Sequence, residues 1–431
     1  MSIENWLDED CYTATQSHNL EAESLFTELQ STSTSIACPT VTSNTMSTEQ
    51  WKDIIIKNGG DILNKYEKLG LMPNTERKQL VNITCAKLVE MYGLKVPEFA
   101  KRNLGEAIIN IFPSLRDPTG KYGYEAFYSN NNGGEGYLSW RLRTIARTTY
   151  KKEGPKRKQK NDLQNEPPAK ITKIIEKTQE ISDAIEFLKH VDKNELDVIY
   201  QKMDFTYKYR KGLGDIILKE FPRFFDVPSL LERDFLIEFP NKVNFEDRFT
   251  ADLDKILNIY DYTVKNPLLD IQKSSPLNEP GWDKTTRAAL AILYMLPPTP
   301  NRQNKENNHL SPIDRFIVFK NNNIPLEEVI SKKRTSQPII VAQGSNKGAI
   351  TQYNIILDNK IIPCPRFCSS AKAIQCLFMS HFVFSLEYDE YLKHFWRFIQ
   401  TYYFEIDAEK IIYTPKMIEL RTRLTHFKVP V

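Results

Sequence analysis

Residues 101–117 read KRNLGEAIINIFPSLRD, residues 210–226 read RKGLGDIILKEFPRFFD, and the two stretches align without a gap. Leu, Gly, Ile, Phe, Pro and Asp recur at matching positions, and most other positions keep their chemical class. The apolar spacing is that of a core-facing helix, and the glycine permits close approach of another helix. The residue before a proline is pushed out of helical backbone, so Phe-Pro ends the helix. We predict a duplicated helical module whose repeated residues form core.

The length and composition limit the classes of protein to which this chain can belong. The chain has 431 residues, enough for several domains that each bury a core. No stretch approaches the roughly 20 apolar residues that cross a bilayer, and the N-terminus lacks the basic and then apolar order of a secretory signal. Six scattered cysteines suit reduced thiols. We expect an intracellular, soluble protein without a membrane partner.

The predicted fold class is mainly α, with two related helical modules followed by a C-terminal α+β domain. The first 48 residues combine acidic residues with Ser/Thr runs and have too little apolar mass to offset chain entropy, which predicts a disordered tail. Periodicity and linker composition give the other boundaries. These are helical module 1 at 49–153 with a basic third helix, a basic linker at 154–170, helical module 2 at 171–263, a helix and linkers at 264–311, and the α+β domain at 312–431.

In the C-terminal domain the periodicity changes from helical to strand-like. Ile313–Phe319, Pro338–Ala342 and Tyr353–Ile362 have the length and apolar enrichment of strands. Asp358-Asn359 is a plausible hairpin turn, and Gly344–Gly348 reads as a turn between strands rather than a phosphate loop. Two helices are expected after these strands.

The third helix of module 1, expected from about Glu135 to Lys151, carries the best binding signal. At about 100° per residue Leu138 and Leu142 share one face with Ile145, while Arg143, Arg147 and Lys151 lie roughly opposite, with Trp140 among them. Many small helical domains meet DNA through such an outward basic face. The predicted nucleic-acid-binding residues are Arg141, Arg143, Arg147, Lys151 and Lys152.

A second basic cluster lies at Lys156, Arg157, Lys158 and Lys160, so that residues 141–160 hold nine Lys or Arg against the single acid Glu153. This cluster serves either flexible phosphate contacts or a nuclear import signal. A solvated face and an acidic protein partner are the remaining interpretations of the basic stripe. Nuclear localisation is common to the import and nucleic-acid interpretations.

The two copies lead into segments of opposite charge. After Asp226 come acids instead of a basic helix, namely Glu232, Asp234, Glu238, Glu246 and Asp247. Only the first module is therefore charged for polyanions. We expect the second to be a spacer or a protein-binding module, and protein partners for the chain as a whole.

A few residues have side chains that could carry chemistry. Cys364, Cys368, Cys376 and His381 invite a zinc interpretation, but the short Cys-x-x-Cys knuckle is missing, and buried free cysteines are common small hydrophobes. No nucleophile elbow, paired-histidine motif or phosphate loop is present in the sequence. We therefore predict no catalytic residues, no metal site, no cofactor, no small-molecule substrate and no enzymatic activity.

Several short phrases are similar to a group of animal proteins labelled sterile alpha motif domain-containing protein three-like. They are RKQLV at 77–81, IFPSLRD at 111–117, GYE at 123–125, GYL at 136–138 and RLR at 141–143, with EFPR at 220–223, QPIIV at 337–341 and HFVF at 381–384 later. The resemblance covers about residues 58 to 405 and implies a multi-domain, non-enzymatic protein. Residues 1–48 hold no sterile alpha motif domain, so polymer formation through that domain does not carry over.

These patterns support two hypotheses for function. The first is a nuclear nucleic-acid- or chromatin-associated regulatory protein that binds phosphates through the basic helix. The alternative is a non-enzymatic protein–protein adaptor whose basic cluster serves only as a nuclear import signal.

Overall fold

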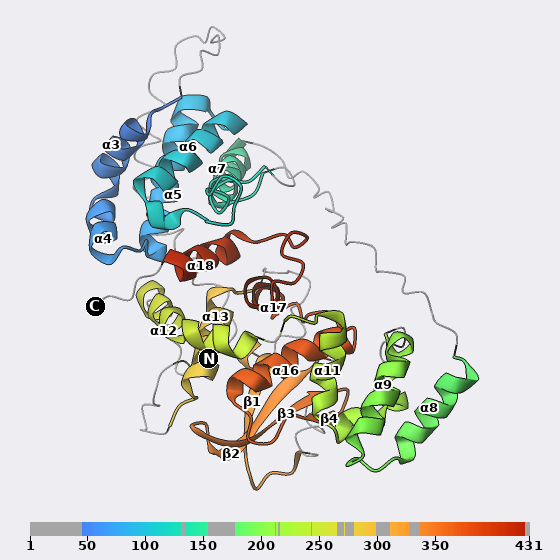
Figure 1. The fold of residues 1–431 in the computed structure, drawn as a ribbon. Helices are drawn as coiled ribbons and strands as arrows, with labels where there is room; N and C mark the ends of the chain where they lie inside the picture. The colour runs from blue at the N-terminus through green and yellow to red at the C-terminus, as the bar shows by residue number, and fades with distance from the viewer. Residues whose placement is uncertain are drawn as a thin grey trace. The chain divides into compact units, whose positions relative to one another are not determined.

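The computed structural model describes residues 45–130, 134–153, 177–211, 213, 216–242, 244–264, 271, 280–298, 311–326 and 337–426. The chain is mostly helical and carries a small C-terminal four-stranded mixed sheet (Figure 1), which confirms the expected mainly α class with an α+β C-terminal part. It divides into two compact units, residues 1–143 with 297–311, and residues 144–296 with 312–431. The acidic tail up to residue 44 and the basic linker at 154–170 lie outside the described residues.

The first unit is built from helices joined by short turns. They are α3 (Thr48–Gly59), α4 (Ile62–Leu69), α5 (Asn74–Tyr92), α6 (Glu98–Ile111), a 3₁₀ turn at Pro113–Leu115, and α7 (Tyr137–Glu153), within which the boundary between the units falls. Ser47 starts α3 through a capping box with Gln50. α3 packs on α5 and α6, and Trp51 of α3, only 1% exposed, donates its indole N–H to Asn103 Oδ1 at 3.2 Å.

The second unit contains the remaining helices and the sheet. Its helices are α8 (Gln179–His190), α9 (Leu196–Arg210), α10 (Ile217–Glu220), a 3₁₀ turn at Pro222–Phe225, α11 (Ser229–Glu238), α12 (Phe245–Thr263), α13 (Lys284–Met295), α14 (Pro312–Phe316), α16 (Ser370–Val383), α17 (Lys393–Phe398) with a π turn at Ile399–Tyr403, and α18 (Pro415–His426). α16 is buried along most of its length between β2 and β3 on one side and α11, α12 and α13 on the others. The second copy of the repeated phrase therefore shares its unit with the C-terminal sheet.

The sheet has the strand order β1-β2-β3-β4. Its strands are β1 (Ile317–Asn321), β2 (Ile339–Asn346), β3 (Ala349–Leu357) and β4 (Lys360–Pro363), and only the β1–β2 pair is parallel. The hairpin turn expected at Asp358-Asn359 is confirmed, because both residues take positive φ (49° and 62°) between antiparallel strands.

One expected strand is wrong in its first half. Residues 312–316 form α14, and strand β1 begins only at Ile317. Pro312 supplies the fixed φ that suits a first helical turn. Phe316 is completely buried, with its ring 5.2 Å from that of Phe395 and 5.8 Å from that of Trp396. Tertiary packing of this ring outweighs the β-prone composition of the stretch.

The repeated phrase ends identically in both copies and begins differently. Phe112 (φ −123°, ψ 77°) and Phe221 (φ −118°, ψ 75°) are both fully buried, and each is followed by a 3₁₀ turn that starts with the proline. In the first copy one continuous helix, α6, leads to this turn, whereas in the second α9 stops at Arg210 and α10 starts at Ile217. The Phe-Pro ending is thus local and robust, while the helix before it depends on its surroundings.

The glycine of the first copy makes its close approach to a side chain, whereas the sequence predicts an approach to another helix. A Cβ on Gly105 would lie 3.1 Å from the ring of Tyr124, which belongs to the connection after α6 and not to a helix. The expected close approach is present, and its partner is an aromatic ring.

Candidate nucleic-acid interface

The start of α7 is fixed by a glycine that no other residue could replace without movement. Gly136 has φ +102°, and a Cβ there would lie 2.3 Å from the carbonyl oxygen of Phe127. This approach lets the amides of Tyr137 and Leu138 donate to the carbonyls of Ala126 (3.1 Å) and Phe127 (3.0 Å). Two helix-start amides are thereby satisfied by backbone, and the direction of α7 is set.

The inner face of α7 packs as the periodicity predicts. Leu138 is fully buried and Leu142 is 7% exposed, while Ile145 is half-buried. The Cys85 thiol on α5 donates to the Leu138 carbonyl at 3.8 Å, and the Arg77 guanidinium lies 3.9 Å from the centroid of the Tyr137 ring. Both contacts tie α7 to α5.

The outer face of α7 presents two arginines. Arg143 and Arg147 are exposed and lie one helical turn apart, and Trp140 is 48% exposed. Lys151 and Lys152 belong to α7, but their side chains lie outside the described residues, as do Lys156, Arg157, Lys158 and Lys160. Two of the predicted phosphate-binding side chains are therefore brought together on one accessible surface, which we call the α7 basic face (Arg143 and Arg147).

Arg141 differs from these two arginines. It is half-buried beside Cys85, and burial lowers the pKa of its guanidinium. Its Nε is buried and has no hydrogen-bond partner among the described residues. The Cys85 thiol is buried as well, which raises its pKa to about 12. This neighbourhood could not be read from the sequence, because it depends on α5 packing against α7.

Arg143 also has a structural contact. Its Nη2 donates to the Gly134 carbonyl, which ties the polar loop before α7 back to the helix. The neighbouring Glu135 has its pKa raised by partial burial, and the Arg143 charge acts in the opposite direction. The Arg143 side chain is thus partly ordered by this contact, which would reduce the entropy it loses on binding an anion.

The acids after the second copy are mostly committed to ion pairs inside the second unit. Asp234 is buried with Arg210, and its pKa is raised by that burial. Glu238 pairs with Lys211, Glu232 pairs with Lys372 at 2.6 Å, and Glu246 lies 3.9 Å from the same lysine. In the sequence these residues are recognised by their charge, and in the structure the ion pairs of Glu232, Asp234 and Glu238 join elements of the second unit.

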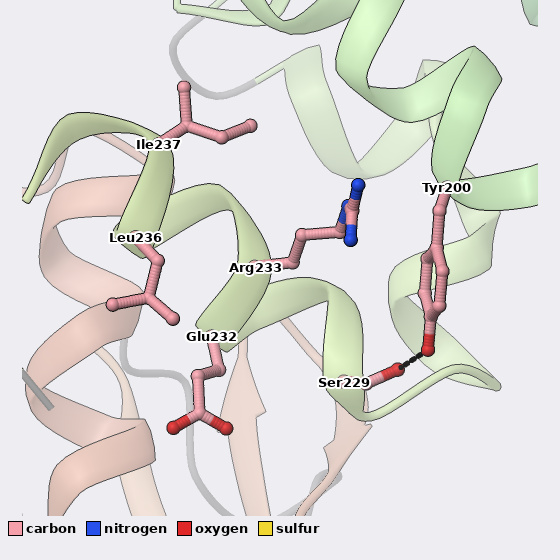
Figure 2. A pocket seen from close by; sticks show the side chains of 6 residues that line it. All are labelled: Tyr200, Ser229, Glu232, Arg233, Leu236 and Ile237. Atoms are coloured by element: carbon pink, nitrogen blue, oxygen red, sulfur yellow. Dashed lines mark hydrogen bonds between the residues drawn. The ribbon is translucent and has the colours of Figure 1, made fainter. Parts of the chain in front are cut away.

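The cavity drawn in Figure 2 lies between α9 and α11 and has a volume of about 420 Å³. It is lined by Tyr200, Ser229, Glu232, Arg233, Leu236 and Ile237. The Arg233 guanidinium is held by Asp204, and the Tyr200 hydroxyl bonds Ser229 Oγ at 2.7 Å. These polar groups bind one another, so the cavity offers a ligand little that is unsatisfied.

Three of the four residues considered for zinc lie together, and the fourth does not. Cys364 is in hydrogen-bonding contact with both Cys368 and Cys376. His381 is buried elsewhere on α16, with Nδ1 2.9 Å from the Leu377 carbonyl and its ring against Tyr388. Within the described part of the chain, no group of three or more His, Cys, Asp or Glu could hold a metal ion.

No family model, curated protein or solved structure matches this chain. The resemblance stated from short phrases therefore stays a prediction. Among the described residues, no helix is long and apolar enough to cross a bilayer.

Proposed function

We propose that the chain is a nuclear nucleic-acid- or chromatin-associated regulatory protein that binds phosphates through the α7 basic face. The observation that carries this proposal is the split along one helix, with Leu138 and Leu142 buried and Arg143 and Arg147 exposed. A guanidinium binds phosphate with two parallel hydrogen bonds. The accessible ring of Trp140 offers a face on which a base can stack.

Comparison of the two copies of the phrase supports one polyanion-binding module and not two. We infer that the two helical modules are related, because both copies of the phrase end in the same buried Phe and the same 3₁₀ turn. The first copy leads into α7 with its exposed arginines, and the second leads into α11, whose acids pair within their own unit. The difference between related modules marks the position where binding was gained or kept.

A salt-titrated binding assay with the full chain tests the proposal against duplex DNA and RNA. Binding at low salt should weaken with a log–log slope of about −0.9 per phosphate contacted. The double variant Arg143→Glu/Arg147→Glu should reduce that slope by about 2. The matched control is Lys57→Glu/Lys68→Glu, an equal change of charge at exposed positions of α3 and α4. If the wild-type chain does not bind at low salt, or if both variants lose affinity equally, the proposal is wrong.

The adaptor hypothesis has its own supporting observation, the side chain of Phe367. This ring is 92% exposed and stands on a non-glycine residue with φ +57°, next to the exposed Arg366. Aromatic side chains and arginine are enriched in protein–protein interfaces. Under this hypothesis Phe367→Asp removes bound protein partners, while reversal of the α7 basic face leaves them in place and the wild type binds no nucleic acid.

A further inference from the structure

Three thiols meet where the sheet passes into its covering helix. Cys364 directly follows β4, and its amide donates to the Tyr353 carbonyl at 3.3 Å. Cys368 directly precedes Ser369, the residue that caps α16 by accepting from the Lys372 amide at 3.0 Å. Cys376 lies within α16. The strand end and the helix start thus bring together side chains that are separated along the chain.

The turn between the first two thiols is tight. The Cys368 amide donates to the Pro365 carbonyl at 3.3 Å. Phe367 reaches this geometry with φ +57°, a conformation that costs a non-glycine residue about 1–2 kcal/mol. Its side chain is 92% exposed and cannot offset that cost by packing. Cys364 and Cys368 therefore flank a closed turn.

The thiols differ in accessibility. Cys364 and Cys376 are only 2% and 3% exposed, whereas Cys368 is half-buried. Cys364 is in hydrogen-bonding contact with both of the others. A reagent from solvent therefore reaches Cys368 before Cys364.

The electrostatics give these two thiols different roles. The hydrogen bond from Cys364, the backbone of Cys368 itself and the nearby Lys372 lower the pKa of Cys368, although partial burial and Glu246 act against them. The hydrogen bonds to Cys368 and Cys376, together with burial, raise the pKa of Cys364 well above its usual range. Since the thiolate is the reactive form, Cys368 is the attacking sulfur and Cys364 the one that keeps its proton.

We propose that Cys368 and Cys364 form a peroxide-oxidised thiol pair. The Cys368 thiolate attacks one oxygen of hydrogen peroxide, the O–O bond breaks, and the products are a sulfenic acid on Cys368 and hydroxide, which takes up a proton to become water. Cys364 then loses its proton and attacks the Cys368 sulfur. The S–S bond forms as the S–O bond breaks, and hydroxide leaves as a second water. Two thiols lose two electrons and two protons, and one peroxide becomes two waters.

This inference goes beyond the proposed function, because it involves only residues of the second unit and no nucleic acid. Cys85 supplies an internal comparison. It is fully buried, its pKa is raised to about 12, and the charge of Arg141 acts against that rise. A folded chain should therefore oxidise at Cys368 while Cys85 keeps its thiol.

Peptide mapping of the full chain after mild peroxide treatment tests the pair. After denaturation and alkylation of the remaining thiols, trypsin cuts after Arg366, so Cys364 falls in peptide 361–366, Cys368 in 367–372 and Cys376 in 373–393. We expect peptides 361–366 and 367–372 to be joined by a disulfide that a dithiol reductant releases. Each alternative pairing of the three thiols would join a different pair of peptides.

Variants assign the two roles. Cys376→Ser should keep the link, Cys368→Ser should abolish it, and Cys364→Ser should leave a sulfenic acid on Cys368 that dimedone traps. A link to peptide 373–393, oxidation of Cys368 to sulfinic acid without any link, or equal oxidation of Cys85 in the folded chain would overturn the proposal. The wild-type map alone decides the pairing if a variant fails to fold.

Discussion

Replacing Arg210 by methionine tests how the second copy of the repeated phrase is anchored. The side chains of Arg210 on α9 and Asp234 on α11 are 1% and 3% exposed. Nε donates to Asp234 Oδ2 at 3.2 Å, Nη2 contacts both carboxylate oxygens at 2.6 Å, and Nη1 donates to Thr206 Oγ1 at 2.6 Å. The variant leaves a buried carboxylate without its counter-charge. Removing one partner of such a pair costs about 3–5 kcal/mol, which lowers Tm by on the order of 10 °C for a unit of this size.

The same two helices supply a matched control. Arg233 on α11 pairs with Asp204 on α9, but these side chains are 41% and 38% exposed. Arg233→Met should therefore cost only about 0–1 kcal/mol in urea unfolding. The double variant Arg210→Met/Asp234→Leu should recover most of the loss, because no unpaired charge remains buried. Equal destabilisation by Arg210→Met and Arg233→Met would refute the argument that burial sets the cost.

Three further predictions concern single residues. Gly136→Ala should destabilise the first unit by about 2–3 kcal/mol or more, because its Cβ meets the Phe127 carbonyl at 2.3 Å, whereas Gly70→Ala, in left-handed α backbone with nothing within 4 Å, should cost about 1 kcal/mol; thermal unfolding of both variants checks this. Burial lowers the pKa of His381 from 6.5 to about 4, so its protonation favours the unfolded chain, and stability should fall by on the order of 3 kcal/mol as pH drops through that window. Urea unfolding of His381→Gln should lack this component. Phe367→Gly should leave stability unchanged or slightly raised, since relief of about 1–2 kcal/mol of strain is offset by about 0.5–1 kcal/mol of backbone entropy; a measured loss above about 1 kcal/mol would show that the ring packs.

Features set by neighbouring residues could be predicted from the sequence. The Asp358-Asn359 hairpin, the Phe-Pro endings and the amphipathic α7 all depend on turn chemistry, proline sterics or helical periodicity. The boundary between helix and strand in the half-buried stretch from Ile313 to Phe319 could not be predicted from neighbouring residues. Its composition suits a strand, and the buried ring of Phe316 decides where the helix ends and the strand begins.

The surroundings of the candidate site residues could not be predicted from the sequence, because they depend on residues far away in the chain. Arg141 looks like its neighbours Arg143 and Arg147 in sequence, yet the packing of Cys85 on α5 buries part of it. In the C-terminal unit three cysteines lie together, but His381 follows Cys376 by five residues on the same helix. That spacing turns its side chain about 140° away, so the two cannot converge on one ion.

Contacts with residues far away in the chain also distinguish the two copies of the phrase. Their first positions are Lys101, which is half-buried with its ammonium 5.5 Å from the Tyr128 ring centroid, and Arg210, which is buried against Asp234. Both positions keep a cation, but one borders solvent and the other anchors a core. The phrase keeps its Phe-Pro ending in these different surroundings. Its repetition therefore reflects a requirement of folding and not a shared binding site. Under the proposed function, binding would differ between the modules through the next helix along the chain, where the first module exposes Arg147.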